Sequence, residues 1–73
     1  LRESLVSVER AGNLAVLRTR DGLGPALVLR LTEASLPQVL GVIGNNDTLF
    51  VATASWNQAQ ELVGVLRRMA KLP

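Results

Sequence analysis

Polar residues able to bind a charged ligand are concentrated at residues 44–48, which read Gly-Asn-Asn-Asp-Thr between two apolar runs. The Asp47 carboxylate, with the Asn46 amide and the Thr48 hydroxyl beside it, could hold a guanidinium or ammonium group. Backbone groups near Gly44 would add further partners. The same residue types are typical of a plain hairpin turn, in which Asn and Asp side chains bond their own backbone. Composition alone leaves both interpretations open.

A second acidic candidate is Asp21, which precedes Gly22 at the start of a predicted helix. Its carboxylate is a second possible partner for a cationic group. Acidic residues are also common near helix N-termini, because they interact favourably with the positive end of the helix dipole. Asp21 is therefore either a ligand-binding residue or part of an ordinary helix start.

Enzyme chemistry is disfavoured by the residue types that the chain lacks. The 73 residues include no His and no Cys, which excludes a Ser-His-Asp triad, a Cys nucleophile, an imidazole base and the common zinc ligand sets. The carboxylates are scattered, at Glu3, Glu9, Asp21, Glu33, Asp47 and Glu61. We therefore expect a binding or structural domain with no enzyme activity, metal or catalytic cofactor.

Charge and hydropathy give little sign of a nucleic-acid or membrane partner. The net charge is only +2, and the basic cluster Arg67, Arg68 and Lys71 falls in the last turns of a predicted helix, where cations favour the negative end of the dipole. No apolar run approaches the roughly 18 residues of a membrane span. The first residues show no signal-peptide pattern. We expect a domain of a longer, cytoplasmic protein.

Six elements must position these residues. Period-2 alternation, turn residues and helical spacing predict strands at 5–10 and 14–19, a helix at 24–34, strands at 39–43 and 48–53, and a final helix that begins at the Ser55 cap and ends before Pro73. The order ββαββα predicts an α+β fold: a two-layer sandwich with a four-stranded antiparallel sheet and two helices on one face. Residues 1–73 are too few for more than one domain.

Individual side chains can be assigned from the same patterns. The alternation in the first strand places Val6 and Val8 on one face, and the continuous apolar run at 39–43 predicts a buried strand. Phe50, on a central strand, is expected in the core. Trp56 adjoins a helix cap and is expected to cover the edge between helix and sheet rather than to stack on a ligand.

Self-association is expected from the small size of the chain. A domain of this length buries a limited fraction of its surface, and without Cys it has no disulfide to stabilise it. The helix at 24–34 is apolar on more than one side, and a single sheet can cover only one of them. The other side is a candidate contact between subunits.

Residues 40–50, which read Leu-Gly-Val-Ile-Gly-Asn-Asn-Asp-Thr-Leu-Phe, resemble the signature of the C-terminal domain of bacterial arginine repressors, roughly L-G-x-I-x-G-D-D-T-I-F. The similarity extends to the strand at 12–19, to Gly22 before an apolar helix, and to the closing amphipathic helix. It covers nearly the whole chain in the same element order.

The resemblance implies a repressor of arginine metabolism whose C-terminal domains form homotrimers, two of which stack into a hexamer. L-Arginine would bind between the trimers as corepressor, at a loop to which Asp47 and Thr48 correspond. DNA would be bound only by a separate N-terminal winged helix-turn-helix domain that is absent from this sequence. The chain would be the oligomerisation and corepressor-binding domain.

Two residues of the loop depart from the family pattern. Asn46 stands where the family has its first Asp, and Asn45 where it has Gly. An amide keeps an acceptor but lacks the charge that makes a contact with guanidinium strong. Two alternatives to arginine sensing therefore stay open: a structural oligomerisation domain with lost or weakened arginine binding, and an unrelated α+β module that binds another metabolite or RNA.

Overall fold

The computed structural model describes residues 4–72, so Glu3 and Pro73 lie outside it. Within this range the chain forms four strands and two helices in the predicted order. They are β1 (Leu5–Ala11), β2 (Leu14–Thr19), α1 (Gly24–Ala34), β3 (Gly41–Gly44), β4 (Thr48–Ala52) and α2 (Trp56–Ala70). The bounds of α1 are those predicted from the sequence.

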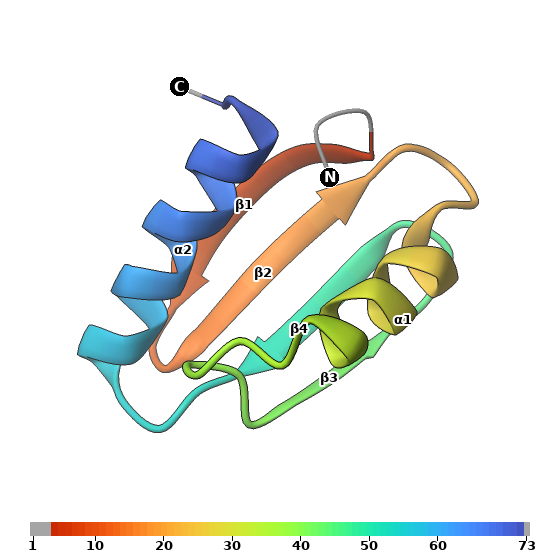
Figure 1. Cartoon of the computed structure of the whole chain (residues 1–73). Coiled ribbons are helices and arrows are strands. Elements are labelled where there is room, and N and C mark those ends of the chain that lie inside the picture. Colours follow the sequence, from red (N-terminus) through yellow and green to blue (C-terminus); the bar gives the residue numbers. More distant parts are fainter. Residues whose placement is uncertain (1–3, 73) are drawn as a thin grey trace.

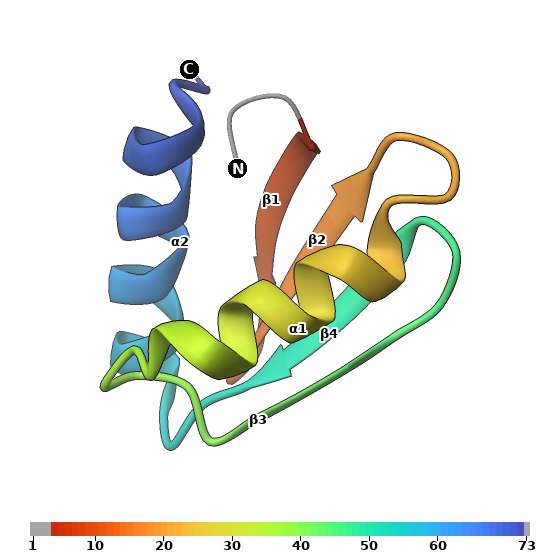
Figure 2. The same ribbon diagram turned by 45° about the vertical axis from the view of Figure 1, so that its right-hand side comes forward.

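The strands form one antiparallel sheet in the spatial order β1-β2-β4-β3. Both helices pack on the same face: α2 lies over β1 and β2, and α1 lies over β3 and β4 (Figure 1, Figure 2). No helix within residues 4–72 covers the opposite, outer face. The predicted two-layer α+β sandwich is confirmed.

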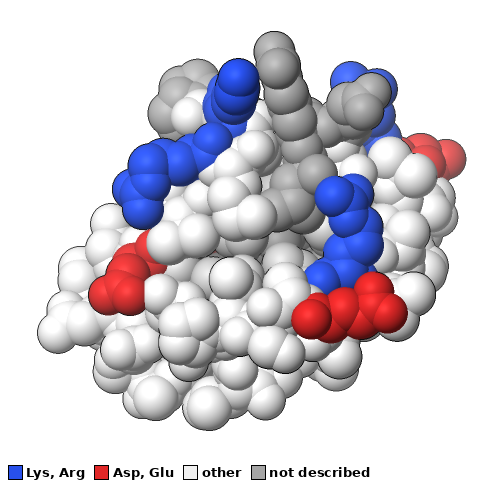
Figure 3. Space-filling model, in the orientation of Figure 1, with Lys and Arg blue, Asp and Glu red and all other residues white. Residues whose placement is uncertain are grey.

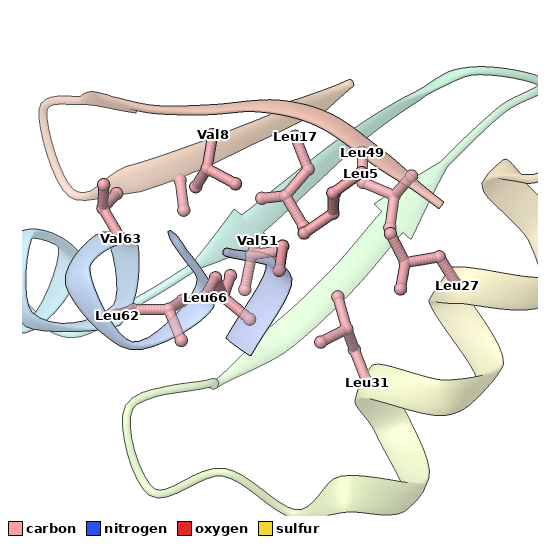
Figure 4. Packing of buried hydrophobic residues seen from close by; sticks show 12 residues of the cluster. Leu5, Val8, Leu17, Leu27, Leu31, Leu49, Val51, Leu62, Val63 and Leu66 are labelled. Atoms are coloured by element: carbon pink, nitrogen blue, oxygen red, sulfur yellow. The ribbon is translucent and has the colours of Figure 1, made fainter. Parts of the chain in front are cut away.

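The core lies where alternate residues of the two central strands meet the apolar sides of both helices. Leu17 of β2 pairs with Leu49 of β4, and Ala15 pairs with Val51, and all four side chains are fully buried. Figure 4 shows helix leucines directed at these strands, namely Leu27, Leu31, Leu62 and Leu66. Truncating a buried leucine to alanine costs about 2–5 kcal/mol. This single cluster therefore fixes both helices on the sheet.

α2 begins with the cap that its sequence predicts and ends with a contact to β1. The Ser55 hydroxyl accepts a hydrogen bond from the Gln58 N–H at 3.1 Å, which satisfies one free donor of the first turn. In the last turns, the Arg67 guanidinium donates two hydrogen bonds to the Val8 carbonyl, at 3.0 and 2.6 Å. The Arg67 charge thus holds α2 against the edge strand.

The prediction that Val6 and Val8 share one face is wrong. Val6 is 57% exposed, whereas Val8 is buried. The pairing of β1 with β2 shifts between Leu5 and Ser7, and such a bulge inserts one extra residue on one strand. Leu5 and Val8 therefore both reach the core although they are three positions apart.

The prediction of a buried strand at residues 39–43 is also wrong. β3 comprises Gly41–Gly44 and forms the edge of the sheet, paired with β4 alone. Leu40 and Ile43 are each 70% exposed. The apolar run at residues 39–43 therefore does not mark a strand buried on both faces. Part of its apolar surface is exposed to solvent in the single chain.

Phe50 was expected in the core, and that expectation is wrong although β4 is a central strand. Successive side chains of a strand point to opposite faces, so the burial of Leu49 and Val51 directs Phe50 to the outer face. There it is 46% exposed, opposite Ile43 of β3 and Val16 of β2. We call Val16, Phe50 and Ile43 the outer row.

Candidate ligand-binding site

The turn between β3 and β4 is shaped by its own first asparagine. The Asn45 N–H donates to the Thr48 carbonyl at 2.9 Å. The Asn45 side-chain oxygen accepts from the N–H groups of Asp47 and Thr48, at 3.1 and 3.0 Å. This is the role expected of Asn in a plain turn. Asn45 therefore shapes the loop through hydrogen bonds within the turn.

Asp47 is exposed at the tip of this turn, and its backbone is tied to the sheet. Its carbonyl accepts from the N–H of Thr19, at the end of β2, at 2.8 Å. The Thr48 hydroxyl donates to one carboxylate oxygen at 3.0 Å. The contacts with the ends of β2 and β4 thus fix the position of Asp47, and its carboxylate is exposed to solvent.

The structure brings Asp21 and Asn46 together, although they are 25 residues apart in sequence. Asp21 lies in a tight turn closed by a hydrogen bond from the Leu23 N–H to the Arg20 carbonyl, at 3.1 Å. Gly22, the third residue of that turn, has φ +84°, a conformation that favours glycine. The Asn46 amide nitrogen donates to the Asp21 carboxylate. Four of the five predicted site residues, Asp21, Asn46, Asp47 and Thr48, therefore lie in two adjoining turns.

Gly24 joins the two turns, and sequence reasoning missed it. Its N–H donates to the Asn46 carbonyl at 2.9 Å. A Cβ on Gly24 would clash with the Asn45 carbonyl oxygen and would lie 2.9 Å from the Asn46 carbonyl carbon. The one sign in the sequence was a glycine directly before Pro25 at the start of the helix. The close contact itself is with the backbone of Asn45 and Asn46, more than twenty residues later, and no local pattern indicates it.

Gly44, the fifth predicted site residue, has a packing role in the structure. A Cβ there would lie 2.8 Å from the Leu49 side chain and 3.2 Å from the Val28 side chain of α1. Its lack of a side chain therefore allows α1 to approach the base of the turn. Nothing observed shows a ligand contact at Gly44 or at the other four residues, whose ligand-binding role stays a prediction.

A hollow of about 260 Å³ adjoins the turn on the outer face of the sheet. It is lined by Ile43, Gly44, Asn45, Thr48 and Phe50. Two apolar side chains and two polar ones thus meet in one depression. Strict alternation along β4 would have placed Phe50 on the face opposite to that of its neighbours Leu49 and Val51, which the structure buries.

Trp56 lies away from this hollow. The Arg10 guanidinium carbon is 4.4 Å from the centre of the Trp56 ring, a cation–π arrangement between β1 and the start of α2. The ring is 53% exposed. Trp56 therefore packs at the corner of helix and sheet, as its position in the sequence suggested.

The chemistry of the two adjoining turns suits a cation that carries an apolar stem. Asp21 and Asp47 supply negative charge, Thr48 supplies a hydroxyl, and the hollow offers apolar wall beside them. Within residues 4–72, no group of three or more acidic, His or Cys side chains could hold a metal ion.

Sequence comparison decides the family. The family model of the arginine repressor C-terminal domain matches residues 1–68. The chain belongs to this family. It is similar to the arginine repressor of Alkaliphilus metalliredigens (strain QYMF), with 34% identity over 70 residues, and to that of Anaeromyxobacter sp. (strain Fw109-5), with 37% identity over 73 residues. The arginine repressor of Thermoanaerobacter sp. (strain X514) is 31% identical over 71 residues.

These alignments cover nearly all of this arginine repressor C-terminal domain but only part of each relative. The alignment with the Alkaliphilus repressor covers 96% of the chain and 47% of the repressor. For the Anaeromyxobacter repressor the shares are 100% and 46%, and for the Thermoanaerobacter repressor they are 97% and 47%. The chain thus spans about half the length of the curated relatives it matches.

Family membership confirms two conclusions drawn from the residues. Arginine repressors are transcription regulators and not enzymes, in agreement with the exclusion based on missing His and Cys. The resemblance carried by residues 40–50 is confirmed, and an unrelated module is excluded. In residues 4–72, neither helix has the length and apolar character to cross a membrane.

The charge distribution also differs from that of a nucleic-acid surface. On the side seen in Figure 3, Lys and Arg side chains form separate small groups in the upper part of the view, acidic side chains lie close to them, and most of the lower part is uncharged. A nucleic-acid site needs clustered positive charge. The RNA-binding alternative gains no support from this side of the domain.

Proposed function

We propose that this chain is the oligomerisation and L-arginine-binding domain of a transcriptional repressor of arginine metabolism, with arginine bound at the β3–β4 turn. The observation that carries the proposal is an exposed carboxylate, Asp47, on a turn fixed by Thr19 and Gly24, in a member of the arginine repressor family. A guanidinium forms its strongest contacts with carboxylates held in fixed geometry.

The outer face of the sheet supports self-association. Ile43 is 70% exposed and Phe50 is 46% exposed, and the two lie opposite each other on neighbouring strands. Contiguous apolar surface of this kind marks interaction sites in soluble proteins. In our proposal a second copy of the domain covers the outer row, which provides the burial that a 73-residue chain lacks.

Binding and assembly are coupled in this proposal. Ile43 and Phe50 belong to the outer row and also line the hollow beside the turn. A ligand at the turn therefore lies next to the surface on which another copy would pack. We propose trimers, with arginine held between two trimers so that it favours a hexamer by mass action. By reciprocity, the hexamer must bind arginine more tightly than separated trimers do.

DNA recognition belongs, in our proposal, to the half of the relatives that this chain does not span. A winged helix-turn-helix domain there would bind the operator in the cytoplasm, and the present domain would control how many such domains act together. L-Arginine is the only small-molecule partner proposed.

Calorimetric titration with L-arginine tests the binding proposal. We expect L-citrulline, which lacks the guanidinium charge, to bind at least about tenfold more weakly than L-arginine, because charge-assisted hydrogen bonds contribute about 1.5–3 kcal/mol. Asp47→Asn should weaken arginine binding by a similar factor, whereas Glu33→Gln, which removes an exposed charge on α1, should not. Equal affinity for the two ligands would contradict a guanidinium–carboxylate contact.

A second function is favoured by one observation. The Asn46 amide donates to the Asp21 carboxylate, so the two turns are joined by the chain's own side chains. A structural oligomerisation domain with lost or weakened arginine binding would use this contact permanently. Such a domain would form its largest assembly in the absence of arginine.

A further inference from the structure

Asp21 adjoins the proposed arginine site through its contact with Asn46. We propose that Asp21 supplies the second carboxylate of the site, and that Asn46 is the positioning residue that holds Asp21 beside the turn. This inference rests on the proposed function. It places one ligand-binding carboxylate in the loop that precedes α1 and the other, that of Asp47, in the β3–β4 turn.

The position of Asp21 relative to the β3–β4 turn is fixed from two sides. On one side, the hydrogen bond between Leu23 and Arg20 and the positive φ of Gly22 define its backbone. On the other side, the Asn46 carbonyl accepts from Gly24, three residues after Asp21, and the space around Gly24 admits no side chain. The Asn46 side chain then reaches the Asp21 carboxylate itself.

The ligand carries more positive charge than the β3–β4 turn alone can balance. L-Arginine carries two cationic groups, the guanidinium and the α-ammonium, and Asp47 is the one carboxylate of the β3–β4 turn. Asn46 contributes no charge. Asp21, which accepts from Asn46 of the same turn, adds a second negative charge, so each cationic group of the ligand has a carboxylate available to it.

The contact with Asn46 leaves the Asp21 carboxylate able to accept further hydrogen bonds. An ionised carboxylate has about four lone-pair positions over two oxygens, and the Asn46 amide occupies one of them. Asp21 is exposed, so a ligand can approach the remaining positions. Asn46 therefore orients the carboxylate without competing for all of it.

Three variants separate the two roles. Asp21→Asn removes the charge but keeps an oxygen that can accept from Asn46, so the loop contact is retained. Asn46→Ala removes the contact and keeps the charge. The double variant tests whether Asn46 acts through Asp21. Glu33→Gln on α1 is the matched control for loss of one exposed negative charge.

Calorimetric titration with L-arginine should show affinity about tenfold lower for Asp21→Asn and about threefold lower for Asn46→Ala, since charged hydrogen bonds are the stronger ones. The double variant should match Asp21→Asn within about twofold, because coupled residues are not additive. Glu33→Gln should bind like the wild type. Ligand-free thermal midpoints should shift by less than about 4 °C, as expected for exposed positions.

The outcomes distinguish this inference from the proposed function. If the wild type binds arginine and Asp21→Asn binds equally well, the inference is overturned and the proposed function stands. If Asn46→Ala weakens binding further in the Asp21→Asn background, Asn46 does not act through Asp21. If the wild type binds no arginine, the proposed function fails and the inference fails with it.

Discussion

The Gly24 N–H donates to the Asn46 carbonyl at 2.9 Å, across the point where α1 begins and the β3–β4 turn passes. Because a Cβ at Gly24 would clash with the backbone of Asn45 and Asn46, this contact requires glycine. The start of α1 and the candidate binding turn are therefore packed directly against each other. A substitution that moves one of them will also move the other.

Gly24→Ala should destabilise the domain by about 3 kcal/mol, because overpacking against backbone cannot be relieved by a side-chain rotation. Urea unfolding at a fixed protein concentration measures this, since assembly also contributes to stability. Gly41→Ala is the matched control, because a Cβ there meets no atom within 4 Å. Equal stability of both variants would show that the close approach at Gly24 is absent.

Phe50→Ser should lower the molar mass of the domain in solution without unfolding it. Phe50 lies in the exposed outer row, so its loss removes apolar surface that a second copy would cover. Met69→Ser is the control, because Met69 of α2 is 49% exposed against 46% for Phe50 but lies on the helix side. Sedimentation at several concentrations should separate the two variants. If both or neither change the mass, the outer row is not the interface.

Asn46→Asp should raise the affinity for L-arginine about tenfold, because it adds a carboxylate to the turn. Without ligand the same variant should be less stable than the wild type, since the new carboxylate would stand beside that of Asp21. Asn57→Asp adds the same charge to the first turn of α2 and should leave arginine affinity unchanged. If Asn46→Asp shows no gain in affinity and the wild type binds no arginine either, the structural oligomerisation domain is favoured.

Arg67→Lys should destabilise the domain by about 1 kcal/mol, because an ammonium cannot reproduce the two guanidinium hydrogen bonds to the Val8 carbonyl. Arg68→Lys, one position further along α2 and exposed, should have almost no effect. Chemical denaturation of both variants checks the difference. Equal losses would mean that the contact with β1 adds nothing to stability.

The helices could be predicted well because their signals are local. Pro25 marks the first turn of α1, and the Ser55 cap with the spacing from Ala59 to Ala70 marks α2. The predictions were wrong where the exposure of a side chain depends on a strand that is distant in sequence. The bulge near Val6 depends on pairing with β2, and exposure of Ile43 depends on β3 being the edge strand.

The candidate site was only partly visible in the sequence for the same reason. Asp47 and Thr48 stand out as polar residues of one turn, but the contact between Asp21 and Asn46 joins segments that are 25 residues apart. Gly24 carries no chemistry of its own, and its importance depends on where the backbone of Asn45 comes to lie. Such close approaches follow from tertiary packing and have no local pattern.

Sedimentation equilibrium with and without millimolar L-arginine, using L-lysine as the control ligand, tests the central claim most directly. The account predicts trimers that become hexamers with L-arginine and stay trimers with L-lysine. A molar mass that does not respond to arginine would contradict the sensing role of the turn. A monomer under all three conditions would contradict the proposed assembly as well.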